Sequence, residues 1–170
     1  MATLTHVQPN LLTVVVEIPK GSRNKYEMDH VTGQLWLDRM LFTSMQYPAD
    51  YGFIEGTLGG DGDPLDALVF VGEPTFPGCH LQARPIGLFR MTDEKGEDEK
   101  ILCVPPQDPL WGHLADLQGV PLTVMNEIEH FFQVYKDLEG HKVSTEGFED
   151  RASADRVIEA ARVRYAATLS

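Results

Sequence analysis

Leu12-Thr-Val-Val-Val-Glu-Ile18, followed by Pro19, is a run of mostly β-branched residues near the start of the chain. Side chains branched at Cβ favour an extended backbone, so the run predicts a β-strand that the proline closes. Further candidate strands follow along the first three-quarters of the chain, separated by many of its 15 glycines and 11 prolines. We expect strands at residues 12–18, 34–37, 67–71, 80–90 and 101–104.

The last quarter of the chain has a helical period instead. Apolar residues recur at three- and four-residue spacing in two stretches, with Met125, Ile128, Phe131, Phe132 and Tyr135 in the first and Ala154, Val157, Ile158, Ala161 and Tyr165 in the second. Ser153 is expected to cap the second helix, and Arg162 and Arg164 suit the negative end of its dipole. Short strands followed by two helices in the C-terminal third indicate an α+β fold with a small closed or nearly closed barrel.

Composition narrows the class of protein. With 170 residues, 42% of them hydrophobic, and no repeat or flexible linker, we expect residues 1–170 to form a single domain. Fourteen Lys and Arg against 26 Asp and Glu give a net charge of −12, opposite to the basic surface of a nucleic-acid binder. The longest early apolar run, residues 11–16, is far short of the roughly 20 residues of a membrane span. Cys79 and Cys103 fit free thiols, so the expected location is the cytoplasm.

The densest chemical signal is Asp61-Gly-Asp-Pro-Leu-Asp66, immediately before the predicted strand 67–71. Three carboxylates in a short loop repel one another unless a cation lies between them, and Pro64 stiffens that loop. A solvated acidic turn is the alternative, but an unpaired Asp66 at the mouth of an apolar strand would be costly. The spacing differs from that of an EF-hand loop. The segment therefore predicts a site for a hard cation.

A second acidic cluster, residues 93–99, follows the predicted strand 80–90. Alone it is typical of a solvated hairpin, but a barrel can bring both acidic segments to the same opening. Oxygen ligands favour Mg²⁺, Mn²⁺ or Ca²⁺ over zinc or copper. The six histidines, His6 among them, lack a metal-ligand spacing. By spacing alone, Lys25 is equally compatible with a solvated loop and Tyr135 with a core position.

Together these residues resemble the soluble, Mg²⁺-dependent, single-domain inorganic pyrophosphatases of bacteria. The family hallmark, D-[GD]-D-P-x-D, is met by Asp61-Gly-Asp-Pro-Leu-Asp66. The other matching segments, in family order, are Glu17-Ile-Pro19, Lys25-Tyr-Glu27, Asp38-Arg39, Tyr47-Pro48, Tyr51-Gly52, Arg84-Pro85-Ile-Gly87, Met91-Thr-Asp93, Gly96-Glu-Asp-Glu-Lys100, His130-Phe-Phe132 and Tyr135-Lys-Asp137.

The resemblance implies a five-stranded OB-like closed barrel with flanking helices, and hydrolysis of inorganic pyrophosphate to two orthophosphates. It implies several Mg²⁺ ions per active site, with Mn²⁺ or Zn²⁺ able to substitute and Ca²⁺ inhibitory. The implied metal ligands are Glu17, Glu27, Asp61, Asp66, Asp93 and Asp98. The implied substrate-binding residues are Lys25, Arg39, Tyr47, Tyr51, Lys100, Tyr135 and Lys136. Asp63 and Asp98 are alternative general bases, and a homohexamer, a dimer of trimers, is the assembly expected.

This set of residues is chemically coherent because metals let an acidic cavity bind an anionic substrate, and water is then the nucleophile. Two other functions stay open on the residues alone. A non-catalytic OB-like module for nucleic acid is disfavoured by the net charge. A metal-dependent phosphohydrolase acting on nucleotides would need a base or ribose pocket, and no such pocket is recognisable in the sequence.

Overall fold

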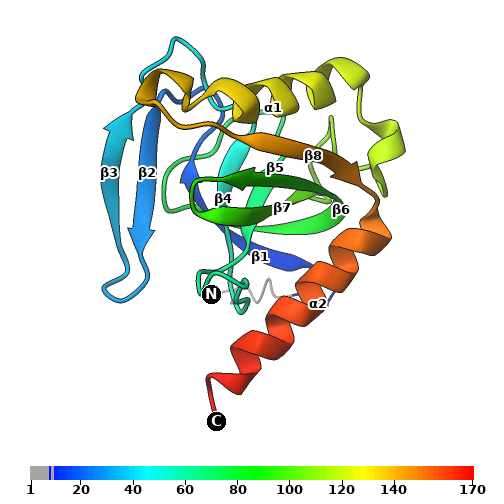
Figure 1. Ribbon diagram of the computed structural model, residues 1–170. Helices are drawn as coiled ribbons and strands as arrows, with labels where there is room; N and C mark the ends of the chain where they lie inside the picture. The colour runs from blue at the N-terminus through cyan, green and yellow to red at the C-terminus, as the bar shows by residue number, and fades with distance from the viewer. Residues whose placement is uncertain (1–7, 9) are drawn as a thin grey trace, which may run out of the picture.

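Five strands close into a hydrogen-bonded ring in the computed structural model, which describes residues 8 and 10–170 (Figure 1). Around the ring the strands are β1 (Leu12–Ile18), β4 (Asp50–Ile54), β5 (Asp66–Val69), β7 (Gly96–Val104) and β6 (His80–Asp93), which pairs again with β1. Neighbouring strands are antiparallel except β5 and β7, which are parallel. The predicted α+β class and closed five-stranded barrel are confirmed. His6 lies outside the described residues.

Three further strands lie outside the ring. β2 (Asn24–Asp29) and β3 (Gln34–Met40) form a separate hairpin, and β8 (Ser144–Glu149) pairs with β6. The five predicted strands are therefore not the five strands of the ring. Residues 34–37 belong to the hairpin, and the unpredicted β4 completes the ring instead.

β4 was not predicted from the sequence, because its central residue is Gly52 and glycine normally weakens a strand. The structure gives the reason for a glycine here. A Cβ at this position would lie 2.0 Å from the carbonyl oxygen of Val15 on β1, a distance that no side chain tolerates. Gly52 therefore lets β4 approach β1 closely enough to close the ring.

Two helices flank the barrel, with α1 (Leu122–Val134) across one side and α2 (Arg151–Ala167) running along another (Figure 1). Both were predicted, with two corrections of detail. α1 ends at Val134, so Tyr135 is its C-cap and Lys136 follows the helix. The N-cap of α2 is Asp150 instead of Ser153, because the Asp150 carboxylate accepts a hydrogen bond from the Ser153 amide at 3.0 Å. Short 3-10 turns, η1 (Leu117–Gly119) and η2 (Asp137–Glu139), bracket α1.

Each helix covers its own part of the core. Alternate residues of β5 face opposite sides, so Leu68 joins the hydrophobic cluster that α1 completes, while Ala67 and Val69 join the one that α2 completes. Ile128 and its neighbours anchor α1, and Ile158 anchors α2. Within the described residues, no helix is both long and apolar enough to cross a membrane.

Candidate active site

A polar cavity of about 340 Å³ opens beside the ring, between the β2–β3 hairpin and the segment that follows α1. Its charged lining is dominated by acids, with seven carboxylates and four lysines. The carboxylates are Glu17, Glu27, Asp61, Asp63, Asp66, Asp93 and Asp98. The lysines are Lys25, Lys95, Lys100 and Lys136, and Tyr51 and Tyr135 also line the cavity. All six residues expected as metal ligands, and both candidate bases, therefore face one space.

Strand register explains how residues far apart in the sequence meet here. Asp66 begins β5, and the parallel pairing of β5 with β7 sets it directly opposite Lys100. Asp93 ends β6 and Asp98 lies near the start of β7, on either side of a tight turn. The two acidic segments thus reach the same opening because the strands that carry them are neighbours in the ring.

The loop before β5 is held from within and from outside. The Asp61 carboxylate accepts a hydrogen bond from the Asp63 amide at 3.0 Å, and the Gly59 amide donates to the Asp63 carbonyl at 2.7 Å. Both backbone groups of Leu58 bond to α2. Its amide donates to the Ala161 carbonyl at 3.0 Å, and its carbonyl accepts from Arg164 Nε at 2.8 Å. The helix therefore fixes the root of the acidic loop.

Lys100 is the centre of the charge network. Its ammonium donates to Asp98 at 2.9 Å, to Asp66 at 3.1 Å and to the Tyr51 hydroxyl at 2.8 Å, and the residue is only 1% exposed. Burial alone would lower the pKa of Lys100, but Asp98 and Asp66 reverse this effect and raise it. Burial also raises the pKa of Asp66, with Lys100 opposing and Asp98 adding to the rise. Two carboxylates and one ammonium leave this group net negative.

Glu17 projects from β1 into the same cavity and is almost fully buried. It accepts a hydrogen bond from the Met28 amide at 2.8 Å, which ties β1 to the hairpin. Burial raises the pKa of Glu17 to about 7; the Met28 hydrogen bond opposes the rise, and the nearby Asp66 adds to it. A further cation in the cavity would favour the ionised forms of Glu17 and Asp66.

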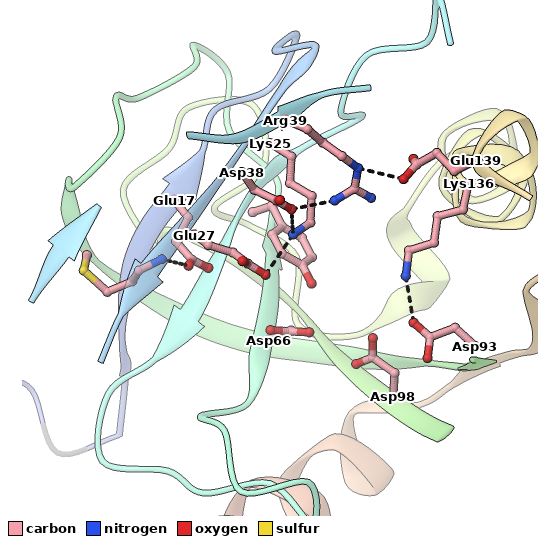
Figure 2. Close-up of polar contacts among 12 residues, drawn as sticks. Glu17, Lys25, Glu27, Asp38, Arg39, Asp66, Asp93, Asp98, Lys136 and Glu139 are labelled. Carbon is pink, nitrogen blue, oxygen red and sulfur yellow. Dashed lines mark hydrogen bonds and ion pairs between the residues drawn. The ribbon is translucent and has the colours of Figure 1, made fainter. Parts of the chain in front are cut away.

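The hairpin contributes a row of ion pairs, drawn in Figure 2. Lys25 Nζ lies 2.9 Å from both Glu27 and Asp38, and Asp38 also accepts a hydrogen bond from Arg39 Nη1. Arg39 Nε lies 2.7 Å from a carboxylate oxygen of Glu139 on η2. Arg39 is at the edge of the cavity and is not part of its lining.

The opposite edge is formed by the segment after α1. Lys136 Nζ is 3.0 Å from Asp93 and 3.2 Å from Glu94.

Tyr47 does not line the cavity, because it is buried behind it and packs on Tyr51, with the ring centres 5.6 Å apart. Burial raises the pKa of Tyr51 well above its usual value, so its hydroxyl stays protonated at neutral pH.

Glu139 was not predicted as a site residue. Its only signal was a negative charge soon after Lys136, which is common on protein surfaces, and its partner Arg39 lies far away in the sequence. The contacts of Asp38 were equally unforeseen, although Asp38 belongs to a segment that matched the family.

The donor set suits hard cations, since every candidate ligand is a carboxylate. The carboxylates that line the cavity outnumber its lysines by three, so an anion could bind here only with added positive charge. Among residues 8 and 10–170, no three His, Cys, Asp or Glu side chains are gathered closely enough to hold a metal by themselves. Lys100 lies between Asp66 and Asp98, and Lys136 engages Asp93. Metal binding would compete with these ammonium groups.

Known proteins similar to this chain in sequence and in structure are inorganic pyrophosphatases. The family model described as inorganic pyrophosphatase matches residues 14–166. An inorganic pyrophosphatase of Streptomyces coelicolor is 58% identical over 153 residues, covering 89% of this chain and 94% of the relative. The crystal structure of the inorganic pyrophosphatase from Thermus thermophilus matches with a TM-score of 0.89 and 42% identity, covering 96% of each chain. That from Helicobacter pylori matches with a TM-score of 0.89 and 41% identity, covering 96% of this chain and 98% of the other. The chain therefore belongs to the inorganic pyrophosphatase family.

Proposed function

We propose that this protein hydrolyses inorganic pyrophosphate to two orthophosphates with water as the nucleophile. The observation that carries the proposal is the shared cavity, which Asp61, Asp66, Asp93 and Asp98 line together with lysines of the hairpin, of the β6–β7 region and of the segment after α1. Membership of the family supports the same reaction. A cavity with both signs of charge suits a substrate that arrives with its own cations.

Divalent metals would be held by these carboxylates. Asp61, Asp66 and Asp98 are proposed as ligands of two activating ions, with Asp66 shared between them. Asp93 and Asp98 are proposed to hold a further ion that arrives with the substrate, supported by Glu17 and Glu27. We propose Mg²⁺ as the natural ion, with Mn²⁺ or Zn²⁺ as substitutes and Ca²⁺ as an inhibitor. When bound, such ions supply the Lewis acidity that activates water and screens the phosphates.

Cationic and hydroxyl groups of the chain would orient the substrate. Lys25, Lys100 and Lys136 supply positive charge on different sides of the cavity. The Tyr51 and Tyr135 hydroxyls can donate hydrogen bonds to phosphate oxygens, with Tyr47 packed behind Tyr51. Arg39 is suited to a charge-assisted phosphate contact from the edge of the cavity. Fixed donors of this kind stabilise negative charge as the bridging bond breaks.

One carboxylate must accept the proton of the attacking water. Asp63 and Asp98 both line the cavity and are the two candidates. Asp63 is the simpler choice, because no described ion pair engages its side chain, whereas Asp98 bonds Lys100.

The deciding experiment measures phosphate release from pyrophosphate and from ATP, each with Mg²⁺. We expect rapid release from pyrophosphate, little from ATP, and inhibition by Ca²⁺. Comparable rates on ATP would favour a nucleotide phosphohydrolase. No release from either substrate, together with salt-dependent retention of single-stranded DNA, would favour the nucleic-acid module.

We also propose a homohexamer, a dimer of trimers, in the cytoplasm. Large apolar side chains are exposed on and beside the hairpin, including Val31, Trp36 and Leu37, and such a surface suits contact with other copies of the chain. Cys79 and Cys103 are both unpaired, which suits a reducing compartment. Sedimentation of the purified protein tests the assembly, and a purely monomeric species would contradict it.

A further inference from the structure

Glu139 makes a contact that the proposed reaction has not yet used. It lies on η2, just beyond the segment that carries Tyr135 and Lys136, and its Oε1 is 2.7 Å from Nε of Arg39 on β3. Its side chain is only 10% exposed. Figure 2 shows the pair at the edge of the cavity, with the guanidinium between Lys25 and Lys136.

The Arg39 guanidinium is held on two sides. Asp38 accepts from Nη1, and Glu139 lies against Nε. No residue in the described part of the chain accepts a hydrogen bond from Nη2, which leaves that nitrogen available to a ligand. An arginine side chain has many rotamers, and fixing it before a ligand arrives removes an entropic cost from binding.

Folding stability alone is a poor explanation for the contact. The other oxygen of Glu139, Oε2, is buried and has no hydrogen-bond partner among the described residues. A buried carboxylate with an unsatisfied oxygen loses its hydration, and an ion pair seldom recovers that loss in full. The short contact with Arg39 is an ion pair without good hydrogen-bond geometry. Because this contact costs desolvation energy, it is better explained by its effect on Arg39, which it holds in position.

The fold also explains why Arg39 needs a link of this kind. β2 and β3 form their own sheet, so no sheet hydrogen bonds among the described residues fix the hairpin to the barrel. Lys136 belongs to the segment after α1, which is a different part of the molecule. The Arg39–Glu139 pair connects the hairpin to this segment directly (Figure 2).

We propose that Glu139 is a positioning residue that holds the Arg39 guanidinium at the cavity edge, ready for a phosphate group of the substrate. The proposal rests on the function proposed above, in which Arg39 contacts phosphate. Glu139 itself touches no reacting atom.

The first test compares steady-state kinetics of Glu139→Gln, Glu139→Asp and the wild type with Mg²⁺ and pyrophosphate. We expect Glu139→Gln to raise KM about three- to tenfold, the effect of leaving one long side chain unordered, and to change kcat less than twofold. Glu139→Asp keeps the charge, so it should recover part of the loss. Asp137→Asn removes an exposed charge from the same turn and is the matched control, with kinetics like those of the wild type. An unchanged KM in Glu139→Gln would overturn the proposal, as would a KM for Glu139→Asp as high as that for Glu139→Gln.

The second test asks whether Glu139 acts through Arg39. In an Arg39→Gln background, Glu139→Gln should raise KM no further, whereas a general structural role predicts the same factor in both backgrounds. Circular dichroism confirms that each variant is folded, and Glu139→Asp replaces Glu139→Gln in the cycle if the latter does not fold. If Arg39→Gln alone leaves KM unchanged, the phosphate role of Arg39 is wrong and this proposal falls with it. A wild type that releases no phosphate would instead refute the proposed function.

Discussion

Burial and the neighbouring Asp98 disfavour the charged form of Asp66, whereas Lys100 favours it. Asp66 begins an apolar strand, it shares Lys100 with Asp98, and burial raises its pKa. For an acid, a raised pKa means that folding disfavours the charged form. Replacing Asp66 with a neutral side chain should therefore cost little folding stability at neutral pH. A carboxylate kept charged at such a place is better explained by function than by stability.

Replacing Asp66 with Asn should therefore separate activity from folding. Asn has nearly the same shape but lacks the charge proposed to be shared by two metals, so we expect Asp66→Asn to lose at least about 100-fold in kcat. Phosphate release at saturating Mg²⁺ and thermal unfolding without metal are the measurements. Glu159→Gln, an exposed change on α2, serves as the control. A rate near that of the wild type would show that Asp66 is not a bridging ligand.

The general base can be identified by comparing Asp63→Asn with Asp98→Asn. If Asp63 is the base, its variant should lose about 100-fold or more in kcat while its Mg²⁺ affinity stays close to the wild-type value. Asp98→Asn should weaken Mg²⁺ binding, because Asp98 is a proposed ligand. The pH–rate profile is the deciding measurement, since only removal of the base abolishes the acidic limb. Loss of that limb in Asp98→Asn alone would assign the role to Asp98.

Residues of the site differ in how far the sequence could reveal them. The acidic loop was visible because three carboxylates lie close together in the chain, and the structure places Asp61 and Asp66 on one cavity. Glu139 was not visible, because its only meaning comes from a partner on another element. Arg39 and Tyr47 were expected from the resemblance to bind substrate, but Arg39 lies beside the cavity and Tyr47 is buried behind it.

At the scale of elements, the strands found from sequence are those that contain a run of apolar residues. They are β1, β3, β5, β6 and β7, although only residues 34–37 of β3 were predicted. β2 and β8 are rich in polar and charged residues and lie outside the ring, so no apolar pattern marked them. β4 belongs to the ring but has glycine at its centre. Its place depends on the close approach of another strand, which a local pattern does not record.

That close approach makes a sharp prediction for Gly52. The Cβ of an alanine would meet the backbone oxygen of Val15, which cannot move without breaking the pairing of β1 and β4. We expect Gly52→Ala to lower the free energy of unfolding by about 3 kcal/mol or more. Gly60→Ala is the control, because a Cβ there has no atom within 4 Å, and its effect should stay within about 1 kcal/mol. Denaturant unfolding measures both, and equal stabilities would contradict the clash.

At the scale of the molecule, a chain with a net charge of −12 concentrates carboxylates in a single cavity. Their mutual repulsion is only partly balanced by Lys25, Lys95, Lys100 and Lys136. We propose that residues 1–170 form one cooperative domain, and the two hydrophobic clusters on opposite sides of the same strands support this view. Cation binding in the cavity should then increase the free energy of unfolding of the whole chain.

Mg²⁺ should accordingly raise the unfolding temperature. An ion that binds only the folded state at about 100 times its Kd adds about 2.7 kcal/mol, which for a chain of this size is a shift of roughly 5–10 °C. NaCl at the same ionic strength is the control, because screening weakens carboxylate repulsion without filling a site and should give a smaller shift. EDTA should reverse the Mg²⁺ effect, and Asp66→Asn should lose most of it. If NaCl matched Mg²⁺, or if Asp66→Asn kept the full shift, the stabilisation would come from general screening instead of from a site built on Asp66.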